Sequence, residues 1–417
     1  MIIYKFGGVS VKDAAAIRNV CEIIRKVRRP LTVVVSAIGQ TTNTLEKVVE
    51  AHYRGNDEVL NLVEEIRAFH YALIEDLFGV VTLGMKRDVD RIFGELESHL
   101  EKIAGESFEF EYDQIIGIGE LLSSRILSAY LKRIGQKNKW VDIRKCLKSD
   151  RTYRDANINW DYSQRLVKRN LKDEPDTLYI TQGFIASDEE GYTTSLGREG
   201  SDYTASILAY LVGAEKMVIW KDVLGILNAD PDYFDNTVKL DLIPYQEAIE
   251  LSYYGARVIH PKTIKPLQAK LIPLWVKSFQ EPEKEGTLIA GGDELLPRLP
   301  NYIVKKRQVL LTLKPLNFSF IGEKDLFFVF SLLTKYRIKL NFSQNTALSF
   351  AFCVDGSARN LEDLVRELEL SFEVLKNDRL ELITIRHYQP ETLQEINQKH
   401  RVLIEQKNYN TAIYLVS

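Results

Sequence analysis

A short polar stretch near the middle of the chain has the residue types that an anion-binding site needs. Residues 195–205 contain two glycines and Arg198 between an apolar run and a run of helical character. Glycines let a ligand approach the backbone closely, and a guanidinium donates two parallel hydrogen bonds to a carboxylate or phosphate. Ser201 and Asp202 are favourable N-cap residues, so we expect a helix to begin here with backbone N–H groups facing a ligand. An ordinary turn is the alternative interpretation.

Two more polar turns follow strand-like runs. One residue separates Lys5 from Gly7-Gly8 at the end of the first such run, and glycine amides beside an ammonium group can form an anion-binding nest. The second turn, residues 36–43, carries hydroxyls and an amide. A solvated surface lysine and an N-cap for the following helix are the alternative interpretations of these two turns.

Two carboxylates also occupy informative positions. Glu120 lies in a predicted helix over residues 113–134 that also contains Gly117 and Gly119. Each glycine destabilises a helix by about 1 kcal/mol relative to alanine, which indicates close approach of a ligand or of another backbone. Packing between helices is the alternative reason. Asp222 directly follows another strand-like run.

The elements that must position these side chains alternate between strand and helix. This alternation predicts a parallel or mostly parallel α/β sheet with both faces covered. A long helical stretch, residues 45–110, is expected as an insertion packed on the sheet. The strands are expected at residues 2–6, 31–38, 140–143, 178–186, 216–223 and 272–279. Since ligands of such sheets bind beyond the carboxyl ends of the strands, the three polar turns stand where a site is expected.

Glycine and proline cluster over residues 291–300 and mark a domain boundary. We therefore predict one domain over residues 1–295 and a second over residues 301–417. The second begins with a βαββαβ pattern, which is typical of a ferredoxin-like unit. Its elements are expected at residues 309–313, 322–336, 338–343, 348–354, 361–370 and 372–375. An incomplete copy follows, at residues 380–385, 390–398, 401–405 and 412–416.

Composition excludes several classes of function. The net charge of −3 gives no electrostatic reason to expect nucleic acid or an anionic membrane as a partner, and the strands of the second domain lack the interleaved aromatic and basic residues of an RNA-binding sheet. The apolar runs are shorter than the roughly 20 residues of a membrane span, and the first residues are typical of a strand and not of a leader. Three distant cysteines argue against disulfides and a structural zinc site. The protein is expected to be cytoplasmic, with no metal ligand assigned.

Taken together and in order, the motifs resemble aspartate kinase over about the first 280 residues. The region after residue 300 is similar to the ACT regulatory region of that family. Each motif is modest, but the ordered set is specific. The matching segments are Lys5-Phe6-Gly7-Gly8-Val9-Ser10, Val33-Val34-Val35-Ser36-Ala37 with Thr42-Asn43, Gly119-Glu120, Gly197-Arg198-Glu199-Gly200-Ser201-Asp202, Asp222-Val223-Leu224-Gly225-Ile226 with Ala229-Asp230-Pro231, and Tyr254-Gly255-Ala256-Arg257-Val258-Ile259-His260-Pro261.

The resemblance implies an amino-acid kinase-like three-layer α/β/α sandwich followed by the ferredoxin-like, ACT-type region. It also implies ATP and Mg²⁺ as cofactors and L-aspartate as substrate. The γ-phosphoryl group would be transferred to the β-carboxylate, giving 4-phospho-L-aspartate, the first step in the biosynthesis of lysine, threonine and methionine. A carboxylate with an ordinary pKa of about 3.9 is already ionised at neutral pH, so no general base is required. Catalysis would consist of positioning and positive charge.

By the same resemblance, Arg198 would bind the α-carboxylate of aspartate and Glu120 its ammonium group. The catalytic residues would be Lys5 and Asp202. Further hydrogen bonds to the substrate would come from Ser36, Thr42 and Ser201. The nucleotide would contact Phe6, Gly7, Gly8, Lys221, Asp222, Arg257 and Val258.

Five positions depart from the usual family pattern. The family usually has glycine in place of Glu199, threonine in place of Val9 and Lys221, arginine in place of Asp232 and an aromatic residue in place of Leu227. Most of these departures fall on the nucleotide side. A catalytically weak, kinase-like protein that binds or senses an amino acid is therefore an alternative function, and a related acyl-phosphate or carbamate kinase is another.

The resemblance also implies assembly and regulation. ACT-type units pair across subunits, so we expect a homodimer or higher homo-oligomer joined partly through residues 301–417. In the loop at residues 316–322, Phe318 and Phe320 stand where an amino-acid effector would need hydrogen-bonding groups. We therefore expect feedback inhibition to be weak or absent.

Overall fold

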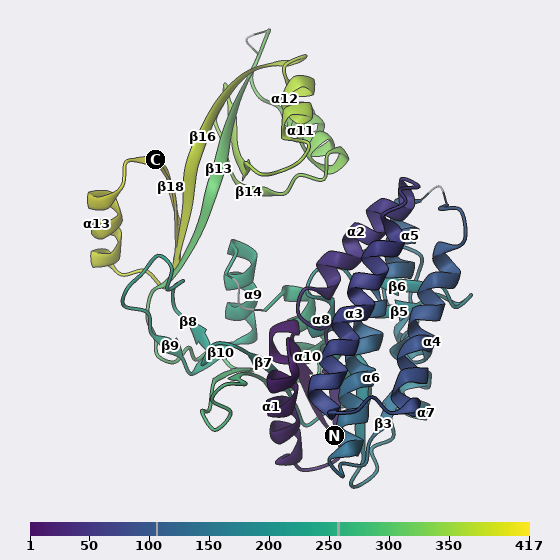
Figure 1. The fold of residues 1–417 in the computed structure, drawn as a ribbon. Helices are drawn as coiled ribbons and strands as arrows, with labels where there is room; N and C mark the ends of the chain where they lie inside the picture. Colours follow the sequence, from purple (N-terminus) through teal and green to yellow (C-terminus); the bar gives the residue numbers. More distant parts are fainter. Residues whose placement is uncertain (106, 257–258, 318) are drawn as a thin grey trace. The chain divides into compact units, whose positions relative to one another are not determined.

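The computed structural model describes residues 1–105, 107–256, 259–317 and 319–417 (Figure 1). The chain divides into two compact units. The first consists of Met1–Ile226, Lys239–Ile249 and Ile259–Pro297. The second consists of Leu227–Val238, Glu250–Val258 and Arg298–Ser417. None of the helices among the described residues is long and apolar enough to cross a membrane.

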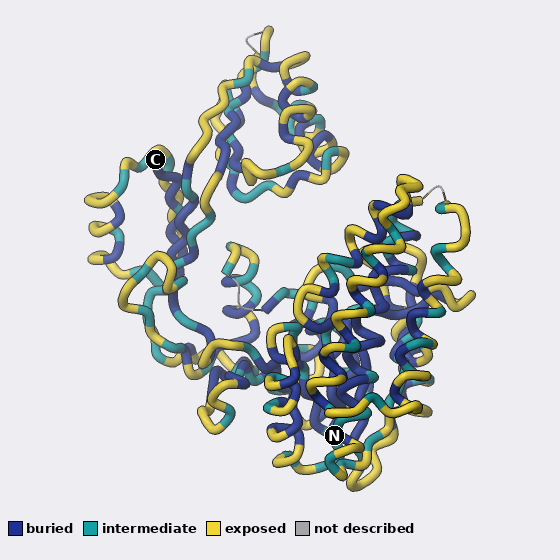
Figure 2. Tube along the Cα trace, viewed as in Figure 1, coloured by how far each residue is buried: buried dark blue, intermediate teal, exposed yellow. Residues whose placement is uncertain are grey.

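The first unit is built on a sheet for which the described residues supply eight strands, in the order β10-β12-β11-β7-β1-β2-β4-β3. Every neighbouring pair is parallel except β11 with β12, which confirms the predicted, mostly parallel sheet. The strands are β1 (Ile2–Phe6), β2 (Leu31–Val35), β3 (Lys139–Val141), β4 (Leu178–Gln182), β7 (Lys216–Lys221), β10 (Leu242–Pro244), β11 (Leu274–Ser278) and β12 (Thr287–Ala290). All five residues of β2 are buried, as its β-branched run predicts. Figure 2 shows buried segments inside this unit and exposed segments at its surface.

Helices cover both faces of this sheet. On one face, α6 packs on β2, β3 and β4 and contacts α1, α2, α3 and α4; on the other, α8 packs on β1, β2 and β7 and contacts α7 and α10. These layers confirm the α/β/α sandwich. The helices are α1 (Ala14–Arg25), α2 (Thr41–Tyr53), α3 (Val59–Phe78), α4 (Leu83–Leu100), α5 (Phe108–Ile116), α6 (Ile118–Arg133), α7 (Trp160–Asn170), α8 (Gly200–Val212), α9 (Tyr245–Tyr254) and α10 (Pro261–Ala269).

The expected single helix over residues 113–134 is wrong, because α5 and α6 meet at Gly117. A Cβ at Gly117 would lie 3.0 Å from a methyl group of Ile185, and one at Gly119 would lie 2.8 Å from the Cβ of Ala37. Gly119 therefore lets the start of α6 approach the loop after β2, and Gly117 lets it approach Ile185. This close approach places Glu120 at the end of the sheet.

Several short elements connect the main ones. The strands β5 (Ile185–Ser187) and β6 (Thr193–Ser195) form an antiparallel pair that was not predicted as such. The remaining short elements are η1 (Gly8–Val11), η2 (Ile143–Lys145), β8 (Ile226–Leu227) and β9 (Lys239–Leu240).

In the second unit, the described residues form an antiparallel sheet in the order β14-β15-β13-β16-β18-β17. The first four of these strands, with α11 and α12, have the βαββαβ topology that was predicted. The elements are β13 (Asn301–Pro315), α11 (Glu323–Lys335), β14 (Leu340–Asn345), β15 (Phe350–Asp355), α12 (Leu361–Leu368), β16 (Phe372–Arg386), α13 (Pro390–Lys399), β17 (Val402–Lys407) and β18 (Thr411–Val416).

The two strands predicted at residues 372–375 and 380–385 are one continuous strand, β16. Its polar middle pairs with β13, and the register shifts there. Arg307 and Arg379 adopt left-handed conformations, with φ of 55° and 57°, beside this irregularity. The first half of β13, residues 301–305, pairs with the second half of β16 and so supplies a fourth strand to the shorter copy. Among the described residues, that copy has a single helix, α13.

Candidate active site

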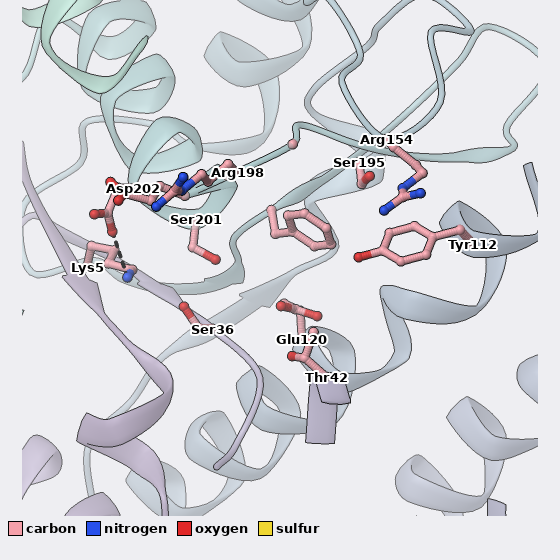
Figure 3. A pocket seen from close by; sticks show the side chains of 14 residues that line it. Lys5, Ser36, Thr42, Tyr112, Glu120, Arg154, Ser195, Arg198, Ser201 and Asp202 are labelled. Carbon is pink, nitrogen blue, oxygen red and sulfur yellow. Dashed lines mark ion pairs between the residues drawn. The ribbon is translucent and has the colours of Figure 1, made fainter. Parts of the chain in front are cut away.

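A cavity of about 390 Å³ lies beside the carboxyl ends of β1 and β2, and fourteen of the described residues line it (Figure 3). Seven of them are residues assigned from the sequence, namely Lys5, Ser36, Thr42, Glu120, Arg198, Ser201 and Asp202. The proposed catalytic pair and the proposed substrate-binding residues, which come from four separate segments of the chain, therefore meet in one place.

An ion pair joins the two proposed catalytic residues. Nζ of Lys5 on β1 lies 2.6 Å from Oδ1 of Asp202 in the first turn of α8, and the two side chains are only 12% and 5% exposed. A Cβ added at Gly7 would lie 3.5 Å from Nζ of Lys5, so the ammonium group is beside the Gly7-Gly8 turn. A Cβ at Gly8 would lie 2.9 Å from the carbonyl oxygen of Ala37, so only glycine fits there. The positive charge and the turn are thus brought together at the end of the sheet.

Glu120 presents a buried carboxylate to the cavity (Figure 3). Its Oε2 has no hydrogen-bond partner among the described residues. Burial raises the pKa of Glu120 to about 8, against the smaller lowering effects of the backbone amides of Glu120 and Ala37 and of the charge of Lys5. A buried carboxylate oxygen without a partner is energetically unfavourable, so the Oε2 side of Glu120 is suited to bind a cationic group.

The turn before α8 differs from the expectation. The N-cap of α8 is Glu199, whose φ of 54° is left-handed, and Ser201 and Asp202 lie in the first helical turn. The helix begins early because the backbone N–H of Gly200 donates a hydrogen bond to the carbonyl oxygen of Gly197 and so forms a tight turn. A left-handed residue at this position explains why glycine is usual there. Here Oε2 of Glu199 accepts a hydrogen bond of 3.0 Å from the backbone N–H of His260 at the start of α10.

Sequence reasoning missed one wall of the cavity, formed by Tyr112, Arg154, Phe184 and Ser195. The guanidinium of Arg154 lies 4.4 Å from the centre of the Tyr112 ring, as in a cation–π contact. Next to Tyr112, the buried Asp113 accepts hydrogen bonds from the backbone N–H of Arg154 at 3.0 Å, the N–H of Ser195 at 2.8 Å and the Ser195 hydroxyl at 2.6 Å. No periodicity or glycine pattern marks Tyr112, Arg154 or Phe184 in the sequence. Ser195 begins the polar stretch 195–205 but was not assigned to the site.

We expect Asp113→Ala to lower the free energy of unfolding by about 3 kcal/mol, because it leaves three buried donors without an acceptor. Urea denaturation measures this change. Ser195→Ala is the matched control, since it removes one of the three hydrogen bonds and should cost about 1 kcal/mol. Equal effects of the two substitutions would show that Asp113 does not organise this wall.

Of the residues assigned to the nucleotide, those that the structure describes lie outside the cavity lining. The side chain of Phe6 is buried and stacked on Trp220 with ring centres 5.8 Å apart, so only its backbone is available to a ligand. Lys221 ends β7, and the exposed Asp222 follows it. Because β1 and β7 are parallel neighbours, these residues stand next to the Gly7-Gly8 turn at the same edge of the sheet. Arg257 and Val258 lie outside the described residues.

Comparisons with known proteins show similarity to amino acid kinases. The model of the amino acid kinase family matches residues 1–278. The lysine-sensitive aspartokinase 3 of Escherichia coli (strain K12) is 29% identical over 397 residues, which cover 92% of this chain and 86% of that protein. An aspartokinase of Chlamydia trachomatis is 34% identical over 291 residues, or 70% of this chain and 64% of that protein. The crystal structure of E. coli aspartokinase III in complex with aspartate and ADP matches with a TM-score of 0.83 and 28% identity, covering 100% of this chain and 96% of that one.

Proposed function

The chain belongs to the amino acid kinase family, and from this premise we propose that it is an aspartate kinase, which transfers the γ-phosphoryl group of ATP to the β-carboxylate of L-aspartate. The product is 4-phospho-L-aspartate, the first intermediate in the biosynthesis of lysine, threonine and methionine. The observation that carries this proposal is the buried carboxylate of Glu120, whose Oε2 has no hydrogen-bond partner among the described residues. It shares one cavity with Arg198 and the Lys5–Asp202 pair. The names of the relatives and the matching aspartate and ADP complex support it.

The charges of the cavity complement those of aspartate. In our proposal the α-ammonium group binds Glu120 and the α-carboxylate binds Arg198, which lines the cavity but is exposed without ligand. The hydroxyls of Ser36, Thr42 and Ser201 supply further hydrogen bonds. This arrangement leaves the β-carboxylate to reach toward Lys5. A substrate without the α-ammonium group would leave the Glu120 carboxylate buried and unpaired, which favours an amino acid as substrate.

The catalytic task of this site is to bring two anions together. The β-carboxylate is already ionised, so no residue has to remove a proton. Bound ATP supplies the phosphoryl group, and Lys5 neutralises charge around it while Asp202 fixes the position of the Lys5 ammonium. Because Lys5 and Asp202 are held by packing on β1 and α8, this electrostatic stabilisation requires little rearrangement during the reaction.

The nucleotide phosphates fit the glycine turn beside Lys5. Backbone amides of Gly7 and Gly8 would contact them, and Lys221 and Asp222 stand at the neighbouring strand end. Magnesium binds mainly through phosphate oxygens, water and one or two carboxylates, so we propose that Mg²⁺ enters with ATP and that Asp202 is the nearest carboxylate of this chain. We propose residues 1–295 as the catalytic domain of a cytoplasmic enzyme and residues 301–417 as an ACT-like regulatory region.

A coupled assay for ADP release tests the proposal. Aspartate at millimolar concentration should support turnover with MgATP, whereas glutamate, which is one methylene longer, should be a much poorer acceptor. If aspartate binds in a calorimeter but ADP release stays at the level of the blank, the protein is a kinase-like amino-acid-binding protein. Equal rates with both amino acids would contradict the assignment of the cavity to aspartate.

The affinity for aspartate should fall as the pH is lowered below about 8. The pKa of Glu120 is raised to about 8 by burial, so at lower pH the free protein holds this carboxyl group protonated. Binding the ammonium group then requires loss of that proton, which weakens binding by up to about tenfold per pH unit. Isothermal titration calorimetry between pH 6 and 9 measures the slope. Glu120→Gln should remove the slope and weaken binding at pH 9; a slope that survives in this variant would assign it to another group.

We propose a homodimer joined partly through residues 301–417. Exposed apolar side chains support this, since Phe327 and Phe330 of α11 and Leu348 are 76%, 47% and 57% exposed. Among the described residues, β14 and β17 are the two edge strands of this sheet, and the outer edge of each pairs with no other strand. Light scattering at micromolar concentration, with Phe327→Lys as the interface variant, distinguishes this dimer from a monomer.

Feedback inhibition by lysine or threonine should be weak or absent. In the loop at residues 316–322, Leu316 and Phe320 are exposed apolar side chains, while Phe318 lies outside the described residues. Such side chains offer no hydrogen bonds to a polar amino acid. Titration of each amino acid up to about ten millimolar in the kinase assay checks this. Strong inhibition below one millimolar would show that an effector site exists, as the name of the lysine-sensitive relative implies for that protein.

A further inference from the structure

Three side chains of metal-ligating type meet in the helical layer, outside the cavity. They are His52 in the last turn of α2, His99 in the last turn of α4, and Glu111 in α5. One ligand atom from each lies within 4.8 Å of the other two. Nε2 of His99 is 2.6 Å from Oε2 of Glu111, and Nε2 of His52 is 3.5 Å from the same oxygen.

The burial of this cluster requires an explanation. Glu111 is 2% exposed and His52 is 8% exposed, and His99 is half-buried. Nε2 of His52 has no hydrogen-bond partner in the described part of the chain, although it is buried beside the carboxylate. Buried polar atoms without partners are rare and energetically unfavourable. The atom therefore points to a group that binds between the imidazoles and the carboxylate.

We propose that His52, His99 and Glu111 form a binding site for a divalent transition-metal ion, for which Zn²⁺ has the best-matched chemistry. Zinc binds imidazole nitrogen at about 2.0–2.1 Å and carboxylate oxygen at about 2.0–2.2 Å, in tetrahedral sites. In such a site two ligand atoms lie roughly 3.4 Å apart, which is close to the His52–Glu111 distance. The shorter His99–Glu111 distance widens when the ion replaces the proton between the two atoms. Water completes the coordination.

The surroundings favour a cation of this kind. Both histidines lie at helix C-termini, where the helix dipoles attract positive charge. The second carboxylate oxygen of Glu111, Oε1, accepts a hydrogen bond of 2.7 Å from the backbone N–H of Gly105, which orients the carboxylate as outer-shell partners of metal sites do. Magnesium and calcium prefer oxygen ligands, so the two imidazoles distinguish this site from that of the Mg²⁺ bound with ATP.

The site connects three helices to the wall of the cavity. Glu111 directly precedes Tyr112, which lines the cavity, and Asp113, which holds Arg154 and Ser195. A bound ion ties α5 to the ends of α2 and α4 and thereby stabilises this wall. Its role is structural, because none of its three ligands lines the cavity. No motif in the sequence predicted it, since the ligands lie far apart along the chain and none is a cysteine.

Zinc binding by the full-length protein, freed of metal with EDTA and of any histidine tag, tests the proposal. Titration against a chromophoric chelator should show one tightly bound Zn²⁺ per chain and a raised Tm, and Co²⁺ should give the visible absorption of a tetrahedral site. His52→Ala should weaken zinc binding by about 100-fold or more. His400→Ala, which removes a histidine of the second unit, is the control and should bind as the unaltered protein does.

Because Glu111 and His52 are buried, a second variant guards against misfolding. His99→Asn changes a half-buried side chain and should keep the circular dichroism spectrum of the folded protein in EDTA, yet bind zinc about 100-fold more weakly. The proposal is overturned if the unaltered protein binds no zinc tightly, or if folded His52→Ala or His99→Asn binds it as tightly as the unaltered protein does.

Discussion

Lys5→Ala should lower kcat for phosphoryl transfer by about 100- to 1,000-fold, or roughly 3–4 kcal/mol of transition-state stabilisation. The ammonium group of Lys5 is buried, paired with Asp202 at 2.6 Å and placed beside the Gly7-Gly8 turn. It therefore meets charge that develops between the attacking carboxylate and the phosphoryl group, and it requires no rearrangement to do so. Because this interaction strengthens in the transition state, KM for aspartate should change little.

Steady-state kinetics with both substrates varied measures the change. Lys12→Ala is the matched control, since Lys12 is an exposed lysine seven positions along the chain that does not line the cavity. Asp202→Ala should lower kcat to a similar degree, and the double variant should be little worse than either single one, because the two residues act as a unit. An unchanged kcat in Lys5→Ala would remove this residue from catalysis.

Arg198→Ala should raise KM for aspartate by about 30- to 100-fold, while KM for ATP and kcat stay close to their original values. A charge-assisted hydrogen bond to a carboxylate contributes about 1.5–3 kcal/mol, and the α-carboxylate is fully charged before the reaction starts. The loss therefore falls on substrate binding and not on the chemical step. Arg198→Lys should recover only part of the affinity, since an ammonium group cannot make two parallel hydrogen bonds.

A second arginine in the same cavity provides the comparison. Arg154 also lines it, but its guanidinium lies over the Tyr112 ring and its backbone is held by Asp113. If Arg154→Ala weakens aspartate binding more than Arg198→Ala does, Arg154 and not Arg198 binds the α-carboxylate. Calorimetric titration of aspartate into both variants separates the two assignments without relying on turnover.

The strand ends and the residues they carry could be predicted from the sequence. Buried β-branched runs such as β2 identify parallel strands, and parallel strands place their following turns at one edge of a sheet. This is why the turns beside Lys5, Ser36 and Asp202, which are far apart in the chain, were expected at one edge of the sheet. Glu120 was assigned to the same site by the resemblance to aspartate kinase. The glycines of α6 also indicated a close approach, although the neighbouring group is the loop at Ala37.

Features set by tertiary contacts could not be predicted in this way. The break between α5 and α6 lies at Gly117, where a Cβ would lie 3.0 Å from Ile185, a residue of a strand that is distant in the sequence. The early start of α8 depends on the left-handed conformation of Glu199, which residues other than glycine rarely adopt. In this conformation the Glu199 side chain accepts a hydrogen bond from the backbone N–H of His260. In the second unit, the polar middle of β16 resembles a turn because its pairing with β13 is not visible in a local pattern.

Trapping the product is the most direct test of whether this protein phosphorylates the β-carboxylate of aspartate. Hydroxylamine converts an acyl phosphate to a hydroxamate, so incubation with aspartate, MgATP and hydroxylamine should yield β-aspartyl hydroxamate, identified by mass spectrometry, in a one-to-one ratio with ADP. Lys5→Ala should form it at least 100-fold more slowly. Release of ADP without formation of hydroxamate would contradict aspartate phosphorylation. So would aspartate binding with no hydroxamate above the blank.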